Sequence, residues 1–170
     1  MTAMSILTRL RRIRPRHAAL AASLAGSLVL TAACGSTEPT SVPIEQTIFA
    51  DTLHITLSQF TRLPSGMYVK DVTTGTGATV AVGQTLNVRY VGQLANGAQF
   101  DANPAPKAVF SFKLGAGQVI PGWDIGLQGM QVGGRRMLII PPELAYGANS
   151  VGSIPPYSVL VFTVDVISAS

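Results

Sequence analysis

The sequence predicts an α+β fold, in which a twisted antiparallel sheet of about five strands wraps around one short helix. Three observations support this prediction. Apolar and polar residues alternate over several short segments, which is typical of strands with one buried face. Turn residues separate these segments, as hairpins require. One stretch alone, residues 122–130, places apolar side chains at helical spacing.

The N-terminus predicts a lipoprotein signal peptide over residues 1–33. Five arginines precede an apolar stretch from Ala18 to Ala33, which is shorter than the ~20 residues of a spanning helix. The stretch ends in Leu-Thr-Ala-Ala-Cys and resembles a bacterial lipobox. The resemblance implies that Cys34 is acylated and becomes the mature N-terminus, anchored to a membrane of the cell envelope. The anchored chain would face the periplasm. In a Gram-negative cell, the membrane that holds it would be the outer membrane.

Two other readings of the N-terminus stay open. Another peptidase could remove the signal and leave Cys34 as a free thiol, or the signal could remain as an uncleaved anchor. Because Cys34 is the only cysteine, an intrachain disulfide is excluded.

The net charge of +4 does not indicate a nucleic-acid partner. Beyond Cys34 the chain carries seven basic and eight acidic residues, a net charge of −1. A phosphate-binding surface needs clustered positive charge, which the processed chain lacks.

Two segments precede the predicted domain of residues 67–170. Residues 34–47 are rich in Pro, Ser and Thr and predict a flexible tether behind the lipidated cysteine. Residues 48–66 predict an N-terminal extension, since apolar residues return between 48 and 63. We expect this extension to pack on the edge of the domain, although a dimer element fits the same pattern.

Five segments predict the strands of the sheet. Each is rich in β-branched or aromatic residues and is bounded by glycine, proline or asparagine. They are residues 67–72, 86–94, 110–114, 135–140 and 159–167.

The last hundred residues contain a series of motifs in collinear order. These are Val88-Arg89-Tyr90-Val91-Gly92, Asn96-Gly97, Phe100-Asp101, residues 110–115, 118–124, 129–130, 141–142, 144–148, 154–156 and 160–162. In order and spacing they resemble the FKBP-type peptidyl-prolyl cis/trans isomerases. The resemblance runs from Met67 to Ile167.

The resemblance implies an FKBP-like fold and an isomerase that assists the folding of exported proteins. It implies catalytic roles for Tyr90, Asp101 and Tyr146, with Asp101 as the one buried carboxylate. It implies a substrate pocket in which Ile154 lies at the rim, lined further by Phe100, Phe110, Val119, Ile120, Trp123 and Phe162. Proline-containing unfolded chains are the implied partners, and macrolide inhibitors are possible ligands.

Two positions depart from the family pattern. Family members often carry an arginine soon after the aspartate, whereas this chain has Asn103-Pro104-Ala105-Pro106 and then Lys107. Asp101 is therefore expected to rely on the Tyr90 hydroxyl. The loop 147–153 is also shorter than in the best-known members and lacks a histidine, which affects sequence preference and macrolide affinity.

The residue types suit this reaction. Rotation about an X-Pro bond must break amide resonance, a barrier of about 18–20 kcal/mol. The planar amide is more polar than the twisted one, so a water-excluding aromatic pocket favours the twisted state. We expect Trp123 as the floor, and a hydroxyl and a carboxylate to orient the carbonyl. No nucleophile, metal or cofactor is required.

Several alternatives compete with this reading. A single aromatic residue on a strand is more often core than pocket, and Phe112, Leu86 and Leu138 are assigned to the core. One cysteine and His54 cannot form a zinc site, and no catalytic signature surrounds His54. The main rival is a non-catalytic chaperone or binding module that uses the same pocket.

Overall fold

The computed structural model describes residues 41–170. The predicted signal peptide, Cys34 and the first part of the predicted tether therefore lie outside the described residues.

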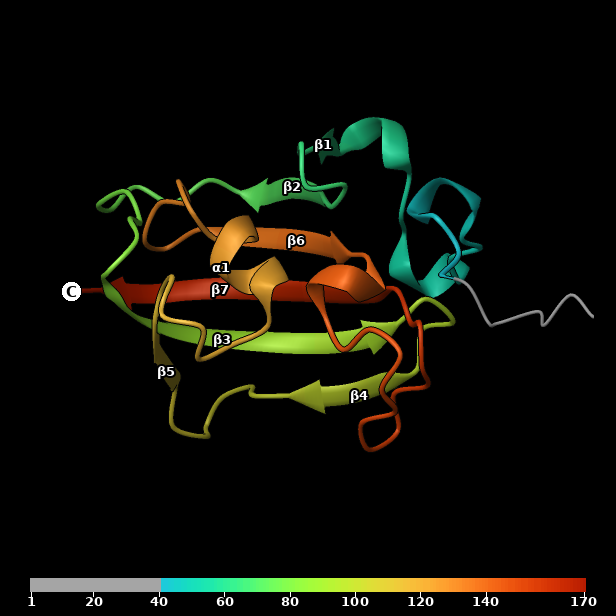
Figure 1. Ribbon diagram of the computed structural model, residues 1–170. Coiled ribbons are helices and arrows are strands. Elements are labelled where there is room, and N and C mark those ends of the chain that lie inside the picture. The colour runs from blue at the N-terminus through green and yellow to red at the C-terminus, as the bar shows by residue number, and fades with distance from the viewer. Residues whose placement is uncertain (1–40) are drawn as a thin grey trace, which may run out of the picture. The chain divides into compact units, whose positions relative to one another are not determined.

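Seven strands form one antiparallel sheet within the described residues, with the order β1-β2-β6-β7-β3-β4 and β5 also paired to β3. Figure 1 shows the sheet with α1 lying across one face. The strands are β1 (Thr61–Arg62), β2 (Tyr68–Thr73), β3 (Thr85–Leu94), β4 (Gln99–Ala102), β5 (Phe110–Lys113), β6 (Arg135–Ile140) and β7 (Leu160–Ala169). The helix α1 spans Pro121–Gly126, and the 3-10 turns are η1 (Ile44–Gln46), η2 (Asp51–Leu53), η3 (Leu57–Gln59) and η4 (Pro142–Leu144).

The predicted fold class is confirmed. The five predicted strands correspond to β2, β3, β5, β6 and β7. The short strands β1 and β4 were not predicted, because two and four residues are too few to show an alternating pattern. The helix ends earlier than predicted, and Gly129 adopts a positive φ of 73° that does not continue a right-handed helix.

The main core lies between the sheet and α1, on the face that we call the inner face. Alternate residues of β7 point to this face, as a strand requires, and Phe162 and Val164 are examples. Phe112, Leu86 and Leu138 are also buried here, as predicted. Two glycines let α1 approach β6 closely: an added Cβ on Gly126 would lie 2.9 Å from the side chain of Leu138, and one on Gly122 would meet Ile140.

The N-terminal extension covers part of the opposite, outer face. Ile44, Tyr68, Ile139 and Val159 are buried together there. Partly buried side chains from residues 49–60 pack against this cluster, and β1 pairs with β2. The extension thus packs across the face of the sheet as well as along its edge.

The end of the predicted tether differs from the prediction where it is described. Ile44 is 2% exposed, and Glu45 accepts hydrogen bonds from the Tyr68 hydroxyl at 2.7 Å and from Arg62 at 3.1 Å. The Pro, Ser and Thr content of residues 34–47 predicted a flexible tether along the whole segment. One isoleucine of this segment is buried instead and attaches it to the domain. No helix in the described part of the chain has the length and apolar character to cross a membrane.

Candidate active site

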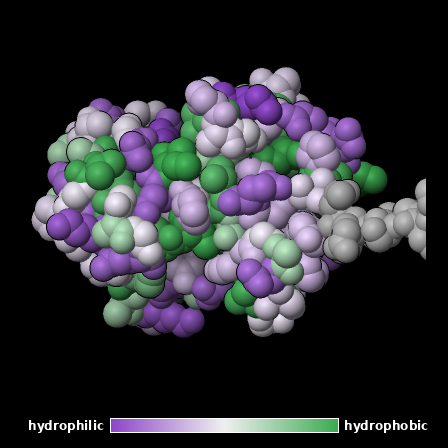
Figure 2. Space-filling view, in the orientation of Figure 1, coloured by the Kyte–Doolittle hydropathy of each residue, from purple (hydrophilic) through white to green (hydrophobic). Residues whose placement is uncertain are grey.

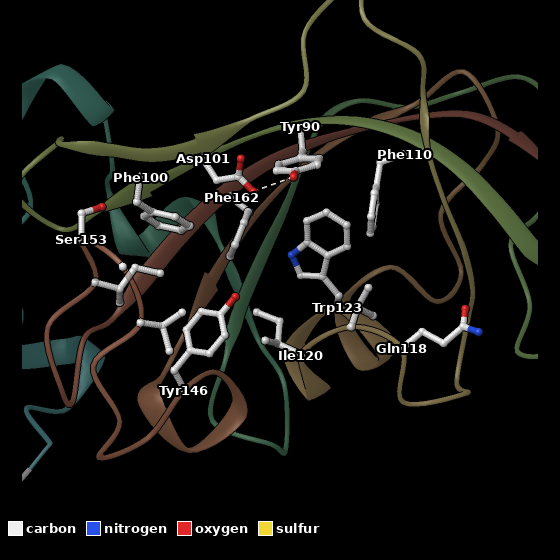
Figure 3. A pocket seen from close by; sticks show the side chains of 14 residues that line it. Tyr90, Phe100, Asp101, Phe110, Gln118, Ile120, Trp123, Tyr146, Ser153 and Phe162 are labelled. Atoms are coloured by element: carbon white, nitrogen blue, oxygen red, sulfur yellow. Dashed lines mark hydrogen bonds between the residues drawn. The ribbon is translucent and has the colours of Figure 1, made fainter.

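The inner face is incompletely filled beside α1, which leaves a cavity of about 430 Å³. All ten predicted site residues line it: Tyr90, Phe100, Asp101, Phe110, Val119, Ile120, Trp123, Tyr146, Ile154 and Phe162. They come from β3, β4, β5, α1, β7 and the loops before α1 and after η4. Figure 3 shows their side chains converging on one space.

Trp123 forms the floor of the cavity. It is 4% exposed, and its ring packs edge-on against Tyr90 and Phe162, with centroid distances of 5.1 and 5.2 Å. Perpendicular contacts of this kind are the preferred geometry of aromatic pairs. The indole Nε1 is buried and has no hydrogen-bond partner among the described residues. The floor is therefore an aromatic ring that neighbouring rings contact on its edges, with one N–H group unpaired among the described residues.

Two side chains fix the helix that carries Trp123. Asp124 accepts hydrogen bonds from the backbone N–H groups of Gly115 and Gly117, at 2.8 and 3.1 Å, and so holds the loop before α1. At the other end, the Arg136 guanidinium donates to the carbonyl of Gly126 and is also paired with Asp71. These contacts set the position of the floor relative to the sheet.

A glycine on β3 allows the two phenylalanine walls to meet. Phe100 and Phe162 pack edge-to-face with centroids 5.4 Å apart. A Cβ added to Gly92 would lie 2.7 Å from the Phe100 ring and 2.8 Å from the Phe162 ring. Gly92 therefore shapes the cavity by leaving room for the two rings. Its place in the Val88–Gly92 motif could have indicated this role.

The polar groups of the cavity begin with a hydrogen-bonded pair. The Tyr90 hydroxyl donates to Asp101 Oδ2 at 2.6 Å, and the backbone N–H of Ala102 donates to Oδ1 at 2.8 Å. Burial and the hydrogen bond to Asp101 raise the pKa of Tyr90. Its hydroxyl thus remains protonated and continues to donate to the carboxylate.

The prediction that Asp101 is buried was wrong, because its residue is exposed. It lies on β4, a short strand at the edge of the sheet formed by the described residues, where β3 is its neighbour. Lys107 does not replace the missing arginine: its Nζ donates to the carbonyl of Ala102 at 3.4 Å. Among the described residues, no salt bridge includes Asp101.

Tyr146 supplies a second hydroxyl on the far side of the cavity. A tight turn places it, in which Gly147, with a φ of 58°, donates its N–H to the carbonyl of Pro142 at 2.9 Å. The hydroxyl points into the cavity (Figure 3). Burial and the nearby negative charge of Asp101 raise the pKa of Tyr146. Its O–H therefore stays protonated near neutral pH and is available as a donor.

The rim of the cavity was only partly predicted. Gln118, Val151, Gly152 and Ser153 also line it. Ile154, predicted at the rim, is 5% exposed and forms part of the wall instead, while Val151 is 41% exposed. Sequence reasoning missed the rim residues because small and aliphatic side chains of an exposed loop carry no pocket signal on their own.

The described residues contain no cluster of three His, Cys, Asp or Glu side chains that could hold a metal ion. The cavity is instead a mainly apolar, aromatic hollow that holds the Tyr90–Asp101 pair and the Tyr146 hydroxyl, which has no hydrogen-bond partner among the described residues. This arrangement suits a ring-shaped apolar group that is flanked by a carbonyl oxygen.

Comparison with known proteins identifies the family. The family model for FKBP-type peptidyl-prolyl cis-trans isomerase matches residues 77–167, more than half of the chain. FK506-binding protein 4 of Gibberella zeae is 52% identical over 106 residues, which is 62% of this chain and 21% of that protein. The chain thus spans about a fifth of that relative's length.

Two solved structures share the fold. The crystal structure of AtFKBP13 is 40% identical, with a TM-score of 0.60 over 65% of this chain and 98% of that one. FkpA from Escherichia coli is 35% identical, with a TM-score of 0.62 over 71% of this chain and 55% of its own. The motifs, the fold and these matches agree: the chain belongs to the FKBP-type peptidyl-prolyl cis-trans isomerase family.

Proposed function

We propose that this protein is a peptidyl-prolyl cis-trans isomerase that acts on proline-containing exported proteins. The observation that carries the proposal is the convergence of the ten predicted residues on one cavity with aromatic walls. Its volume of about 430 Å³ is of the size that small-ligand pockets usually have. A prolyl ring fits the apolar floor that Trp123 provides.

The cavity lowers the rotational barrier by replacing water. A planar amide is resonance-stabilised and strongly polar, and water solvates it better than it solvates the twisted amide. Surrounding the X-Pro bond with aromatic carbon removes that preference and stabilises the transition state relative to the ground state. Each factor of ten in rate requires about 1.4 kcal/mol of such differential stabilisation.

The polar groups orient the substrate within the apolar walls. The Tyr146 hydroxyl donates a hydrogen bond to a substrate carbonyl, since it is protonated and has no other acceptor in the described part of the chain. The Tyr90–Asp101 pair faces the carbonyl that rotates with the X-Pro bond. Both roles need only hydrogen bonding, so the reaction proceeds without a covalent intermediate.

The test is a protease-coupled isomerase assay on the purified chain with short X-Pro peptides. We expect the wild-type chain to accelerate interconversion well above the uncatalysed rate. Asp101→Val should reduce kcat/KM by about tenfold or more, the loss expected when a hydrogen-bonded charge is removed. Val82→Asp, an exposed position outside the cavity, is the control and should retain full activity. A folded wild-type chain without turnover would favour the binding module.

We also propose that the protein is an exported bacterial lipoprotein, anchored through Cys34 to a membrane of the cell envelope. The basic n-region, the apolar stretch before Ala33 and the lipobox-like sequence support this proposal. Expression in a bacterial host with a labelled fatty acid tests it. The wild-type chain should incorporate label and fractionate with membranes, whereas Cys34→Ser should do neither. Label retained by Cys34→Ser would contradict the proposal.

Macrolides of the FK506 type are proposed inhibitors. The relative from Gibberella zeae is an FK506-binding protein, and the aromatic walls here are complete. Inhibition of the wild-type isomerase assay by FK506 tests this, with direct binding of FK506 to the Trp123→Ala variant as the comparison. Saturable inhibition is expected, with an affinity that the loop from Val151 to Ser153 modifies because it forms the rim.

A further inference from the structure

A second hollow of about 450 Å³ lies at the end of the domain where the β3–β4 turn meets the N-terminal extension. We call it the uncharged groove, because none of its lining residues is Asp, Glu, Lys, Arg or His. Its apolar lining residues come from the N-terminal segment (Val42 and Ile48), from the end of β3 (Leu94) and from the segment before β7 (Pro155, Tyr157 and Val159). Figure 2 shows apolar surface beside the extension at this end.

The most exposed large apolar side chain of the described region belongs to this groove. Ile48 is 91% exposed and Val42 is 51% exposed. Exposed aliphatic groups gathered in an uncharged hollow are a feature of binding surfaces. Both residues precede the segment 77–167 that matches the family. The extension therefore contributes part of the groove's lining, and residues inside the matched segment contribute the rest.

Backbone hydrogen bonds preform the groove. The N–H of Ala50 donates to the carbonyl of Ala95 at 2.9 Å and joins the extension to the β3–β4 turn. On the other side, the Tyr157 N–H donates to the carbonyl of Gly147 at 2.7 Å. Because these bonds hold the backbone on both sides, a ligand has less backbone to order, which reduces the entropic cost of binding.

The groove adjoins the active-site cavity. Ile154 lines the cavity and the next residue, Pro155, lines the groove. The two hollows therefore meet at adjacent residues of one loop, whose Cα atoms are about 3.8 Å apart. A polypeptide whose proline occupies the cavity could then continue past this loop and along the groove in an extended conformation.

We propose that the uncharged groove binds apolar side chains that flank the proline of an unfolded client polypeptide. This inference rests on the proposed isomerase function and adds an extended substrate site to it. The chemistry of the lining favours this occupant, since aliphatic and aromatic side chains without charges suit the apolar residues of an unfolded chain. Glu45 and Asp51 are exposed on the same extension. Arg62 pairs with Glu45, so it is the negative charge of Asp51 that opposes contact with an anionic lipid surface.

The test compares two substrates on the purified full chain and on Ile48→Asp. One is a short X-Pro peptide that fills the cavity alone. The other is a reduced, carboxymethylated ribonuclease whose refolding is limited by prolyl isomerisation. Ile48→Asp should lower kcat/KM for the protein substrate by about tenfold, as expected when burial of one isoleucine is lost, and should leave the peptide unchanged. Val82→Asp, a second exposed position at 58%, should change neither.

A proline-free apolar peptide provides an independent readout. A peptide of about ten residues spans roughly 33 Å when extended, long enough to fill the groove. It should inhibit turnover of the protein substrate without inhibiting the short peptide. Its fluorescently labelled form should bind the wild-type chain and lose affinity for Ile48→Asp, whether or not the chain shows isomerase activity. Failure of the isomerase proposal is thereby separated from failure of this inference.

Three outcomes would overturn the inference. Equal effects of Ile48→Asp on both substrates would show damage to the cavity. Unchanged peptide binding would show that the groove is not the site. A shift from dimer to monomer in Ile48→Asp, with both substrates unaffected, would assign the groove to a contact between two copies of the chain.

Discussion

The two faces of the sheet bury apolar side chains in different ways. On the inner face, regular elements leave a cavity beside Trp123, and rings that contact one another keep it open. On the outer face, Ile44 is buried in one cluster with Tyr68, Ile139 and Val159. The difference indicates that contacts to the prolyl ring belong to the inner face, whereas burial in the outer-face cluster contributes stability. The predictions below separate these two contributions.

The largest expected effect is on the outer face. Ile44→Ala removes a side chain that is 2% exposed and leaves a cavity. The free energy of unfolding should fall by about 2–5 kcal/mol. Turnover of short X-Pro peptides, measured at a temperature where the variant is folded, should not change. Chemical denaturation measures the stability and the isomerase assay measures the turnover. Loss of turnover in the folded variant would contradict the assignment of the outer-face cluster to stability alone.

A change on the inner face should alter both quantities. The Cβ of Gly92→Ala would lie within 2.8 Å of the Phe100 and Phe162 rings, so both walls must move. We expect a loss of about 1–3 kcal/mol in stability from overpacking, together with a raised KM. The double variant Gly92→Ala/Phe100→Leu makes room and should recover part of the stability. A stable Gly92→Ala with unchanged KM would contradict the close packing.

A smaller effect is expected from one hydroxyl. Tyr146→Phe keeps the ring and removes a donor that has no partner between residues 41 and 170. Stability should change by less than about 0.5 kcal/mol, while kcat/KM should fall several-fold, in line with one hydrogen bond of about 1 kcal/mol. Tyr157→Phe, a tyrosine outside the cavity, is the control for the short-peptide assay. Equal activities of both variants would remove Tyr146 from the mechanism.

The smallest effect concerns pH. The Tyr68 hydroxyl, the backbone of Glu45 itself and then Arg62 lower the pKa of Glu45 below its ordinary value of 4.5. A carboxyl whose folded pKa is lowered stabilises the fold above its unfolded pKa, and this stabilisation is lost as the pH falls through the folded pKa. Thermal melts should therefore show a steeper loss of stability below pH 4.5 in the wild-type chain than in Glu45→Gln. Parallel pH curves would contradict this role.

Much of the inner face could be predicted from the sequence because its residues lie in motifs that have the order and spacing of the FKBP family. Tyr90, Phe100 and Trp123 were each placed in the pocket by a motif, and each lines the cavity. The exposure of Asp101 was not predictable from spacing, since it depends on β4 being a short strand paired on one side. The backbone contacts that shape the rim likewise leave little trace in residue types.

The outer face and the uncharged groove could be predicted less well from the sequence. The regular structure of the extension consists mainly of short 3-10 turns, and such turns lack a long hydrophobic period. Ile44 lies among Pro, Ser and Thr residues that indicate a tether by composition. The groove itself requires residues 42–48 and 155–159 to meet, which only the three-dimensional arrangement brings about.

The central claim is that the apolar cavity above Trp123 accelerates rotation about the X-Pro bond. Exchange NMR on a short X-Pro peptide measures this directly, because the cis and trans signals exchange at a rate that needs no coupled protease. The account predicts faster exchange with the wild-type chain and, with a folded Trp123→Ala chain, a rate close to that of the free peptide. Exchange that is equally fast with both chains would show that the floor of the cavity does not contribute to the reaction.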